Sequence, residues 1–262
     1  MNKTILVTGS TDGIGLLTAK KLAADGHKVL LHGRSASKLE RAAAAVGDDV
    51  ETYAADLSDL SAVRKLAENV RANHHNLDVL INNAGVLKAP QTVLENGQDI
   101  RFVVNTLAPF LLTELLLPII PAGGRVVNLS SAAQAPVNIN AMQGNVPLAD
   151  MEAYAQSKLA ITIWTREWAK SLSNAPVMVA VNPGSLLASK MVKEGFGLAG
   201  NDMNIGADIL IDAALGARFA DASGAYFDND SGAFADPHAA ARDKNHTADV
   251  MNKIKDLISR TG

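Results

Sequence analysis

Short runs of β-branched, apolar residues alternate with helix-length segments along most of this 262-residue chain. The runs are continuously apolar, which is the pattern of strands covered on both faces, as in parallel sheets. Between them, Leu60, Val63 and Leu66 follow helical spacing after Ser58, which we expect to cap that helix. The clearest runs lie at residues 5–7, 29–31, 79–81, 126–127 and 177–179. This repetition predicts an α/β protein with one doubly wound domain over residues 1–262 and a mainly parallel sheet with right-handed crossovers.

The composition limits the partners that the chain can have. The net charge is −3, so no basic excess indicates nucleic acid or an anionic membrane surface. Cysteine is absent, which excludes disulfides and thiolate metal sites. Residues 1–4 lead into a short apolar run rather than a signal peptide, and stretches such as 115–120 are too short to cross a bilayer. We therefore expect a cytoplasmic protein with no nucleic-acid or membrane partner.

Metal chemistry is not expected either. His74, His75 and His238 lack the carboxylate or histidine spacing of a metal site, so we predict no catalytic metal.

Three regions break the regular alternation. Residues 132–150 contain two prolines and a glycine and are expected to form a loop. Residues 185–206 are rich in glycine and methionine, and we expect them to be mobile. Residues 223–238 mix glycine, aspartate and aromatic residues, with one possible strand at 225–227.

A glycine-rich turn follows the first strand and opens the first helix. Gly9, Gly13 and Gly15, with Ile14, have the spacing G-x-x-x-G-x-G. Backbone without a Cβ can turn sharply and let a pyrophosphate approach the helix N-terminus, where free N–H groups favour anions. An ordinary strand–helix turn would give a similar local pattern, but the surrounding strand–helix–strand context favours a dinucleotide site.

The second strand ends at His32-Gly33-Arg34. NAD sites place a carboxylate about 20 residues after the glycines to hold the ribose 2′-OH, and here Arg34 stands in that region. A guanidinium can pair with a 2′-phosphate, so the sequence favours NADP, with NAD as the alternative cofactor. A solvated surface arginine is the competing interpretation, and His32 is expected to be an ordinary strand-end residue rather than a ligand.

Further polar and small residues follow the next two strands. Asp56 and Leu57 come after the third strand, and Asn83, Ala84 and Gly85 come after the fourth. Open α/β sheets bind ligands at the carboxyl ends of their strands, so these residues are candidates for cofactor binding. Each of the two segments alone is also compatible with turn stabilisation.

Tyr154 and Lys158 are four residues apart in a segment of helical spacing over 151–172, so they share a helix face. A free phenol has a pKa near 10, and a neighbouring ammonium or oxidised nicotinamide favours the phenolate. Tyr154 can then exchange a proton with a substrate oxygen. A surface Tyr–Lys pair has the same spacing. Trp164 and Trp168 share an apolar stripe of this helix, as part of the core or of a subunit contact.

Taken together, these motifs resemble the short-chain dehydrogenase/reductase superfamily over nearly the full length of the chain. The matching segments are TGSTDGIG at 8–15, DL at 56–57, NNAG at 82–85, Asn105 in VNTLAPF, Ser130 with Ser131, YAQSK at 154–158 and NPG at 182–184. The long spacing from Ser131 to Tyr154 and the YAQSKLA sequence resemble the retinol-dehydrogenase-like branch. The resemblance implies a Rossmann-type fold with a seven-stranded parallel sheet and a nicotinamide cofactor.

The resemblance also implies a catalytic tetrad of Asn105, Ser131, Tyr154 and Lys158. Lys158 would lower the pKa of Tyr154 and hold the nicotinamide ribose, and Ser131 would donate to the developing oxyanion. Ser130 competes for that role, although the family uses the second serine of such a pair. Asn105 would support a proton relay through water, or have a purely structural role.

Pro183 and Gly184 follow the sixth strand, and the resemblance places this turn against the nicotinamide. Many relatives have threonine four positions after this glycine, where this chain has Ala188 and then Ser189, so Ser189 receives no firm role. Apolar residues nearby are candidates to line a substrate pocket or to be core residues: Leu186, Leu187, Met191, Phe196, Leu198 and Met203.

The sequence thus predicts an NADP-dependent oxidoreductase acting on a small, fairly apolar carbonyl or alcohol. Residues 1–110 would mainly bind cofactor, and residues 111–262 would supply the catalytic groups and the substrate loop. A dinucleotide-sensing protein without turnover is the alternative, and a lyase or epimerase with tightly bound NAD is a third. The family resemblance also predicts a homodimer or homotetramer.

Overall fold

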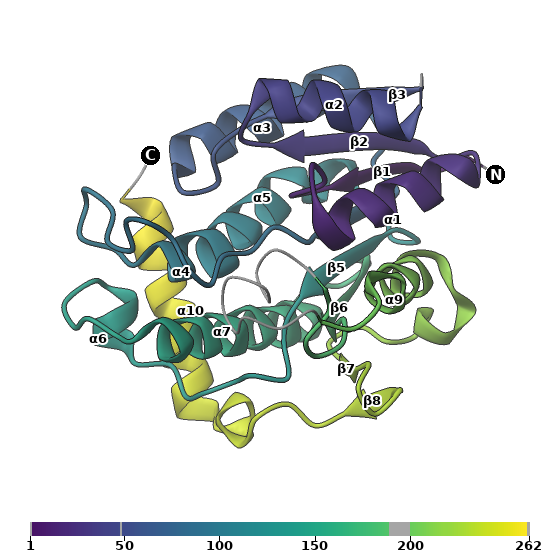
Figure 1. Cartoon of the computed structure of the whole chain (residues 1–262). Helices are drawn as coiled ribbons and strands as arrows, with labels where there is room; N and C mark the ends of the chain where they lie inside the picture. The colour runs from purple at the N-terminus through teal and green to yellow at the C-terminus, as the bar shows by residue number, and fades with distance from the viewer. Residues whose placement is uncertain (1, 48, 189–199, 261–262) are drawn as a thin grey trace.

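Eight strands form one sheet in the order β3-β2-β1-β4-β5-β6-β7-β8 (Figure 1). The computed structural model describes residues 2–47, 49–188 and 200–260. The strands are β1 (Thr4–Val7), β2 (Lys28–Gly33), β3 (Val50–Ala54), β4 (Val79–Asn82), β5 (Arg125–Leu129), β6 (Val177–Asn182), β7 (Tyr226–Asp228) and β8 (Ala233–Ala235). The first seven are parallel and β8 pairs antiparallel with β7, so the expected seven-stranded parallel sheet carries an additional edge strand.

Helices cover both faces of the sheet. The α-helices are α1 (Gly13–Ala24), α2 (Ala36–Val46), α3 (Leu60–Asn73), α4 (Ile100–Phe102), α5 (Ala108–Leu116), α6 (Ile139–Met142), α7 (Asp150–Ser171), α9 (Met203–Leu215) and α10 (Lys244–Ser259). Shorter helical turns are η1 (Val103–Leu107), η2 (Leu117–Ile119), η3 (Ala217–Phe219) and η4 (Ala239–Arg242). Helices α1, α2 and α9 pack on one face, and α3, α5 and α7 pack on the other. Ile5 and Val7 contact the first layer and Leu6 the second, which is why the strands are apolar at every position.

The first and last parts of the chain contribute to the same sheet. Strands β1–β4 precede residue 110 and β5–β8 follow it, and β4 pairs directly with β5. The strand order reverses between β1 and β4, so the connections after these two strands run to opposite faces of the sheet. Such a reversal creates a crevice at the carboxyl ends of the strands, where open α/β sheets bind ligands.

The start of α3 differs from the sequence-based prediction. Asp59 is the cap, because its carboxylate accepts from Ser61 N at 2.8 Å, and α3 begins at Leu60. Ser58 instead donates its hydroxyl to Asp56 at 2.7 Å. Ser58 and Asp59 are both suited to cap the helix. Because the Ser58 hydroxyl is bonded to Asp56, Asp59 forms the cap.

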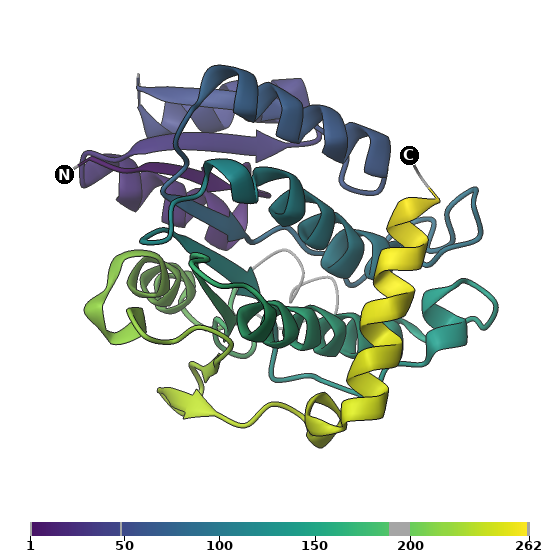
Figure 2. The ribbon, with the colours of Figure 1, turned by 180° about the vertical axis from the view of Figure 1, so that it is seen from behind.

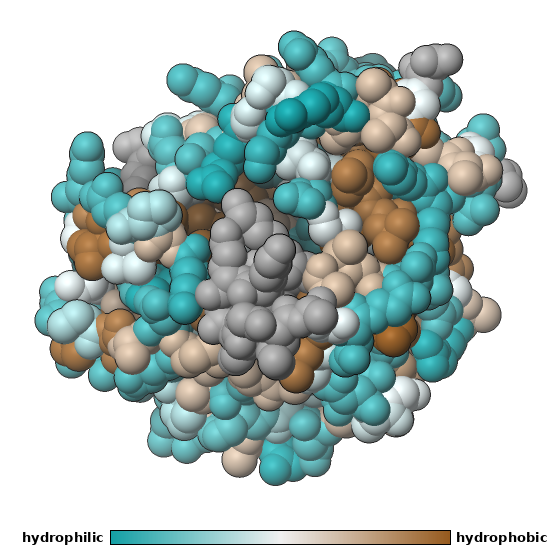
Figure 3. Space-filling view, in the orientation of Figure 1, coloured by the Kyte–Doolittle hydropathy of each residue, from teal (hydrophilic) through white to brown (hydrophobic). Residues whose placement is uncertain are grey.

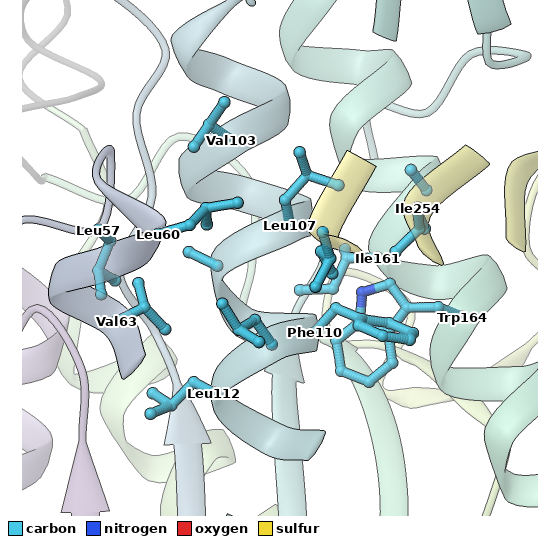
Figure 4. Close-up of a cluster of buried hydrophobic side chains, with 14 of the residues drawn as sticks. Leu57, Leu60, Val63, Val103, Leu107, Phe110, Leu112, Ile161, Trp164 and Ile254 are labelled. Atoms are coloured by element: carbon cyan, nitrogen blue, oxygen red, sulfur yellow. The ribbon is translucent and has the colours of Figure 1, made fainter. Parts of the chain in front are cut away.

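Helix α10 crosses the outer side of α7 (Figure 2). Its apolar residues belong to the same buried cluster as the two tryptophans of α7. Phe110 lies against Trp168 with ring centroids 4.2 Å apart, and Trp164 and Trp168 are 5.5 Å apart. Figure 4 shows Ile254 of α10 in the same buried cluster as Phe110 and Trp164. Trp164 is fully buried and Trp168 nearly so, hence this stripe belongs to the core of the chain and not to a subunit contact.

One apolar helical run is longer than the apolar stretches identified in the sequence. Within the described ranges, Ile100–Ile119 has enough length and hydropathy, 20 residues with a mean of 1.8, to cross a membrane by those criteria. The expectation that every apolar stretch is too short was therefore wrong. The run comprises α4, η1, α5 and η2, and 67% of its most apolar window is buried inside the protein, as in a core helix.

The three irregular regions turned out differently from one another. Residues 132–149 are a loop as expected, except for the single helical turn α6, and Asp150 already belongs to α7. The possible strand at 225–227 is confirmed as β7, while β8 was missed. The expectation of mobility at 185–206 falls largely on residues 189–199, which lie outside the described residues.

Candidate active site

The glycine turn after β1 is shaped by close backbone contacts. Gly9 has φ +66°, and a Cβ there would lie 2.9 Å from Ala84 Cα. A Cβ on Gly15 would lie 2.4 Å from Asn83 Nδ2. Gly13 also has positive φ, +56°, but a Cβ there would meet no atom within 4 Å, so this side of the turn is open. The turn is thus packed on its inner side and open on its outer side, which fits a pyrophosphate cradle.

Helix α1 begins at this open side. Asp12 caps it by accepting from Gly13 N at 2.8 Å. The N–H groups of Ile14 and Gly15 belong to the first helical turn and have no intrahelical partner. These two donors are suited to an anion held by the turn.

The segment after β4 supports the glycine turn. Asn83 Nδ2 donates to Thr8 O at 2.8 Å and to Gly9 O at 3.2 Å, and Ala84 N donates to the Thr8 hydroxyl at 3.1 Å. Gly85 follows as an exposed residue. Asn83 and Ala84 therefore hold the turn in place through hydrogen bonds to Thr8 and Gly9.

Asp56 and Leu57, after β3, also have structural partners. Asp56 Oδ1 accepts from Ser58 N and Oγ at 2.9 and 2.7 Å, and Leu57 is buried in the core. Arg34, after β2, is exposed beside the turn. A Cβ on Gly33 would lie 2.5 Å from Thr11 Cγ2, so the end of β2 approaches the glycine turn closely and brings Arg34 near it.

His32 lies at the end of β2, as expected, and its imidazole is also bonded to two other strand ends. Its side chain is buried, Nδ1 accepts from Gly9 N at 3.2 Å, and Nε2 lies 3.2 Å from Ala55 O. Burial lowers the pKa of His32 to about 4. A histidine inside an otherwise apolar strand was the available signal, but its two partners are not neighbours in sequence.

Tyr154 and Lys158 lie one turn apart on α7, as their spacing predicted. Lys158 Nζ lies 5.6 Å from the centre of the Tyr154 ring and donates to Leu129 O, at the end of β5, at 2.8 Å. Lys158 is buried, and burial lowers its pKa to about 8.

The pKa of Tyr154 is shifted in the opposite direction from the one expected. Burial raises the pKa of Tyr154 above its ordinary value, and a hydrogen bond with the Ser131 side chain opposes that shift. The Lys158 ammonium lies over the Tyr154 ring, 5.6 Å from its centre. The phenol therefore depends on a further positive charge, such as an oxidised nicotinamide, to become acidic.

The structure places Ser131, and not Ser130, at the Tyr154 side chain. Ser130 is buried, and its hydroxyl lies 2.6 Å from that of Thr162. The Ser131 carbonyl accepts from the Tyr226 hydroxyl at 3.1 Å and from Gln134 Nε2 at 2.9 Å. Local spacing does not predict these two supporting contacts, because Tyr226 is 95 residues from Ser131.

Asn105 lies in η1, a π-helical turn, and its side chain is fully engaged by protein groups. Its Oδ1 accepts from Val86 N at 2.8 Å, and its Nδ2 donates to Val86 O at 2.9 Å and to the Ser157 hydroxyl at 3.0 Å. These bonds join the segment after β4 to α7. The side chain therefore has a structural role here, and a part in a proton relay stays a prediction. Single π-turns inside helices often mark functional sites.

The turn at Pro183 and Gly184 follows β6. Gly184 has φ +122°. Asp230 accepts from Ser185 N at 2.7 Å and from Asn182 Nδ2 at 2.9 Å, which fixes this turn to the β7–β8 connection.

The proposed pocket residues divide into three groups. Leu187 is buried, whereas Leu186 is exposed. Met203 is the first residue of α9. Ser189, Met191, Phe196 and Leu198 lie outside the described residues. The face seen in Figure 3 is mainly hydrophilic with separate apolar patches.

Metal ligands do not cluster in the described part of the chain, where no group of three or more His, Asp or Glu side chains is placed to hold an ion. His74 Nε2 lies 2.9 Å from Glu51 Oε2, a carboxylate that no local spacing in the sequence indicated.

Comparison with known proteins agrees with this geometry. The short chain dehydrogenase family model matches residues 3–196. Human (Homo sapiens) retinol dehydrogenase 13 is 36% identical over 200 residues, which cover 70% of this chain and 58% of that protein. The chain thus spans less than two thirds of that relative's length.

Solved structures extend the match over the whole fold. An uncharacterised protein from Mycobacterium paratuberculosis superposes with a TM-score of 0.80 and 29% identity, covering 98% of this chain and 93% of that one. A short chain dehydrogenase from Shigella flexneri, complexed with NADP, has a TM-score of 0.69 and 27% identity, covering 88% of this chain and 98% of that one. This chain therefore belongs to the short-chain dehydrogenase/reductase superfamily, and retinol dehydrogenases are among the proteins to which it is similar.

Proposed function

We propose that the protein is an NADP-dependent oxidoreductase that interconverts a carbonyl and an alcohol on a small, fairly apolar substrate. The observation that carries the proposal is that Lys158, Tyr154 and Ser131 meet at the carboxyl end of β5. The glycine turn follows β1 at the same edge of the sheet. Retinol dehydrogenases among the relatives support alcohol/carbonyl chemistry.

A nicotinamide held at the glycine turn would supply or accept the hydride. Tyr154 donates a proton to the carbonyl oxygen during reduction and takes it back during oxidation. The Ser131 hydroxyl bonds the same oxygen as charge develops on it. Lys158 places a positive charge beside Tyr154. Like its family counterparts, it would also bind the nicotinamide ribose.

Arg34 supports NADP as the preferred cofactor, with NAD as the second. Arg34 is exposed and directly follows Gly33, which approaches Thr11 of the turn closely, and a guanidinium in this region could pair with a 2′-phosphate. The NADP complex of the Shigella relative supports the same choice.

The remaining parts of the proposal concern the setting. We propose a cytoplasmic protein without a nucleic-acid or membrane partner, in which residues 1–262 work as one domain. A homodimer or homotetramer would use surfaces other than the Trp164–Trp168 stripe, since α10 covers it. Light scattering of the purified protein measures the number of subunits.

The test is oxidation of NADPH and NADH with a panel of aldehydes and ketones. We expect turnover with NADPH, and Tyr154→Phe should lower kcat by about 10²–10⁴-fold. Tyr53→Phe is the matched control, because Tyr53 is also buried, and its hydroxyl bonds Glu51 at 2.9 Å and His74 rather than any proposed catalytic residue. Intact turnover in Tyr154→Phe refutes the mechanism, and dinucleotide binding without turnover on any substrate indicates a sensor instead.

A further inference from the structure

His32 joins two cofactor-side strand ends through its imidazole. Nδ1 accepts from Gly9 N in the glycine turn at 3.2 Å, and Nε2 lies 3.2 Å from Ala55 O, next to Asp56. The ring is 1% exposed, so water does not replace either partner. Its backbone is bound to the same turn, because His32 N donates to Ser10 Oγ at 2.9 Å and Ser10 N donates to His32 O at 3.0 Å.

Only one form of the ring satisfies both partners. Gly9 N–H is a donor, so Nδ1 must carry a lone pair, while the Ala55 carbonyl is an acceptor, so Nε2 must carry the hydrogen. That form is the neutral Nε2–H tautomer. A protonated ring would direct an N–H group at the N–H of Gly9. Asp56 is the carboxylate that acts on the ring, and it favours the charged form less strongly than burial disfavours it.

The two partners follow the two strands that flank β2, since Gly9 comes after β1 and Ala55 comes after β3. Gly9 belongs to the turn that would hold the pyrophosphate, and it approaches Ala84 so closely that its backbone has little freedom. Ala55 lies between the end of β3 at Ala54 and Asp56, and Arg34 is two residues beyond His32. The imidazole thus fixes the turn with respect to the strand ends that carry the other cofactor-side residues.

We propose that His32 is a positioning residue for the dinucleotide site, which holds the glycine turn in register with the ends of β2 and β3. The inference rests on the proposed function, because the site it organises is the proposed cofactor site. It assigns His32 a role in cofactor affinity rather than in proton transfer.

The test compares His32→Gln with His32→Leu in the full chain. Glutamine offers one acceptor and one donor on a side chain of similar reach, whereas leucine offers neither. We expect His32→Leu to weaken NADPH binding, measured by fluorescence titration, by about tenfold or more, with kcat at saturating NADPH largely retained. His32→Gln should stay within about threefold of the native protein. His74→Leu is the matched control, because His74 is also buried but bonds Glu51. The NADPH affinity of this variant should equal that of the native protein.

A second measurement covers the case in which His32→Leu fails to fold. Nitrogen-15 NMR of the native protein at pH 7 should show His32 as the neutral Nε2–H tautomer. An Nδ1–H tautomer, a charged ring, or native NADPH affinity in His32→Leu would each overturn the proposal, as would equal losses in the Gln and Leu variants. Tight NADPH binding without turnover would refute the proposed function alone, whereas absence of dinucleotide binding by the native protein would refute both.

Discussion

Lys158 Nζ lies 5.6 Å from the centre of the Tyr154 ring and is held there by a 2.8 Å hydrogen bond to Leu129 O. The helical period of α7 brings the two side chains onto one face, and the end of β5 fixes the ammonium. Lys158 is 3% exposed, and no carboxylate is among its partners in the described part of the chain. A buried ammonium held mainly by a carbonyl oxygen is costly for folding, so its presence is best explained by function.

Replacing this lysine should therefore stabilise the protein and inactivate it. Burial lowers the pKa of Lys158 from 10.5 to about 8, so between those values the unfolded chain binds the proton more tightly and native stability rises with pH. Below pH 8 the buried ammonium lowers the unfolding free energy by on the order of 3 kcal/mol. Lys158→Met removes this cost but leaves the Leu129 carbonyl without its donor, which costs about 1 kcal/mol. We expect Lys158→Met to raise the unfolding free energy at pH 7, to remove the rise between pH 8 and 10.5, and to abolish turnover. Urea unfolding across this range measures it, and a destabilised variant would contradict the argument.

Acid should destabilise the protein through His32. Its pKa falls from 6.5 in the unfolded chain to about 4 in the fold, so the unfolded state binds more protons between these values. Native stability should decline as the pH falls from 6.5 to 4, by up to about 3 kcal/mol from this group. His32→Gln removes the titrating group and should flatten the decline over this window, as followed by urea unfolding at several pH values. An unchanged slope would show that other groups cause it.

The glycine turn should tolerate no side chain at Gly9. Alanine there combines φ +66° with a Cβ 2.9 Å from Ala84 Cα. Gly232→Ala is the matched control, because Gly232 has φ +69° but open space around the Cβ position. We expect Gly232→Ala to cost about 1 kcal/mol, from backbone strain alone, and to keep native NADPH affinity. Gly9→Ala should cost clearly more and lose NADPH binding; equal effects of the two substitutions would exclude a steric role for Gly9.

Tyr226 should matter for the placement of Ser131. Burial raises the pKa of Tyr226, so its hydroxyl stays protonated and donates to Ser131 O at 3.1 Å, next to the Gln134 bond. Tyr226→Phe leaves one donor in place and should cost about 1 kcal/mol of stability. We expect kcat to fall several-fold while the KM for NADPH stays unchanged, in steady-state kinetics at saturating cofactor. Native kcat in both Tyr226→Phe and Gln134→Met would show that this carbonyl needs no support.

Local pattern was enough to predict much of this protein. Continuous apolar runs predicted β1, β2, β4, β5 and β6, and helical spacing placed Tyr154 and Lys158 on one face. These predictions succeed because strand burial and helix period depend on residues that are close together in the chain. Where two local solutions compete, as at Ser58 and Asp59, the pattern alone chose the wrong cap.

Tertiary structure decided what lies between distant segments. His32 meets Gly9 across 23 residues, Tyr226 meets Ser131 across 95, and α10 covers Trp168 from the far end of the chain. These long-range contacts decided whether the tryptophans belong to the core or to a subunit contact. They also decided the role of His32. No local spacing encodes them, because they arise only when parallel strands are joined by crossovers and their carboxyl ends are brought to one edge of the sheet.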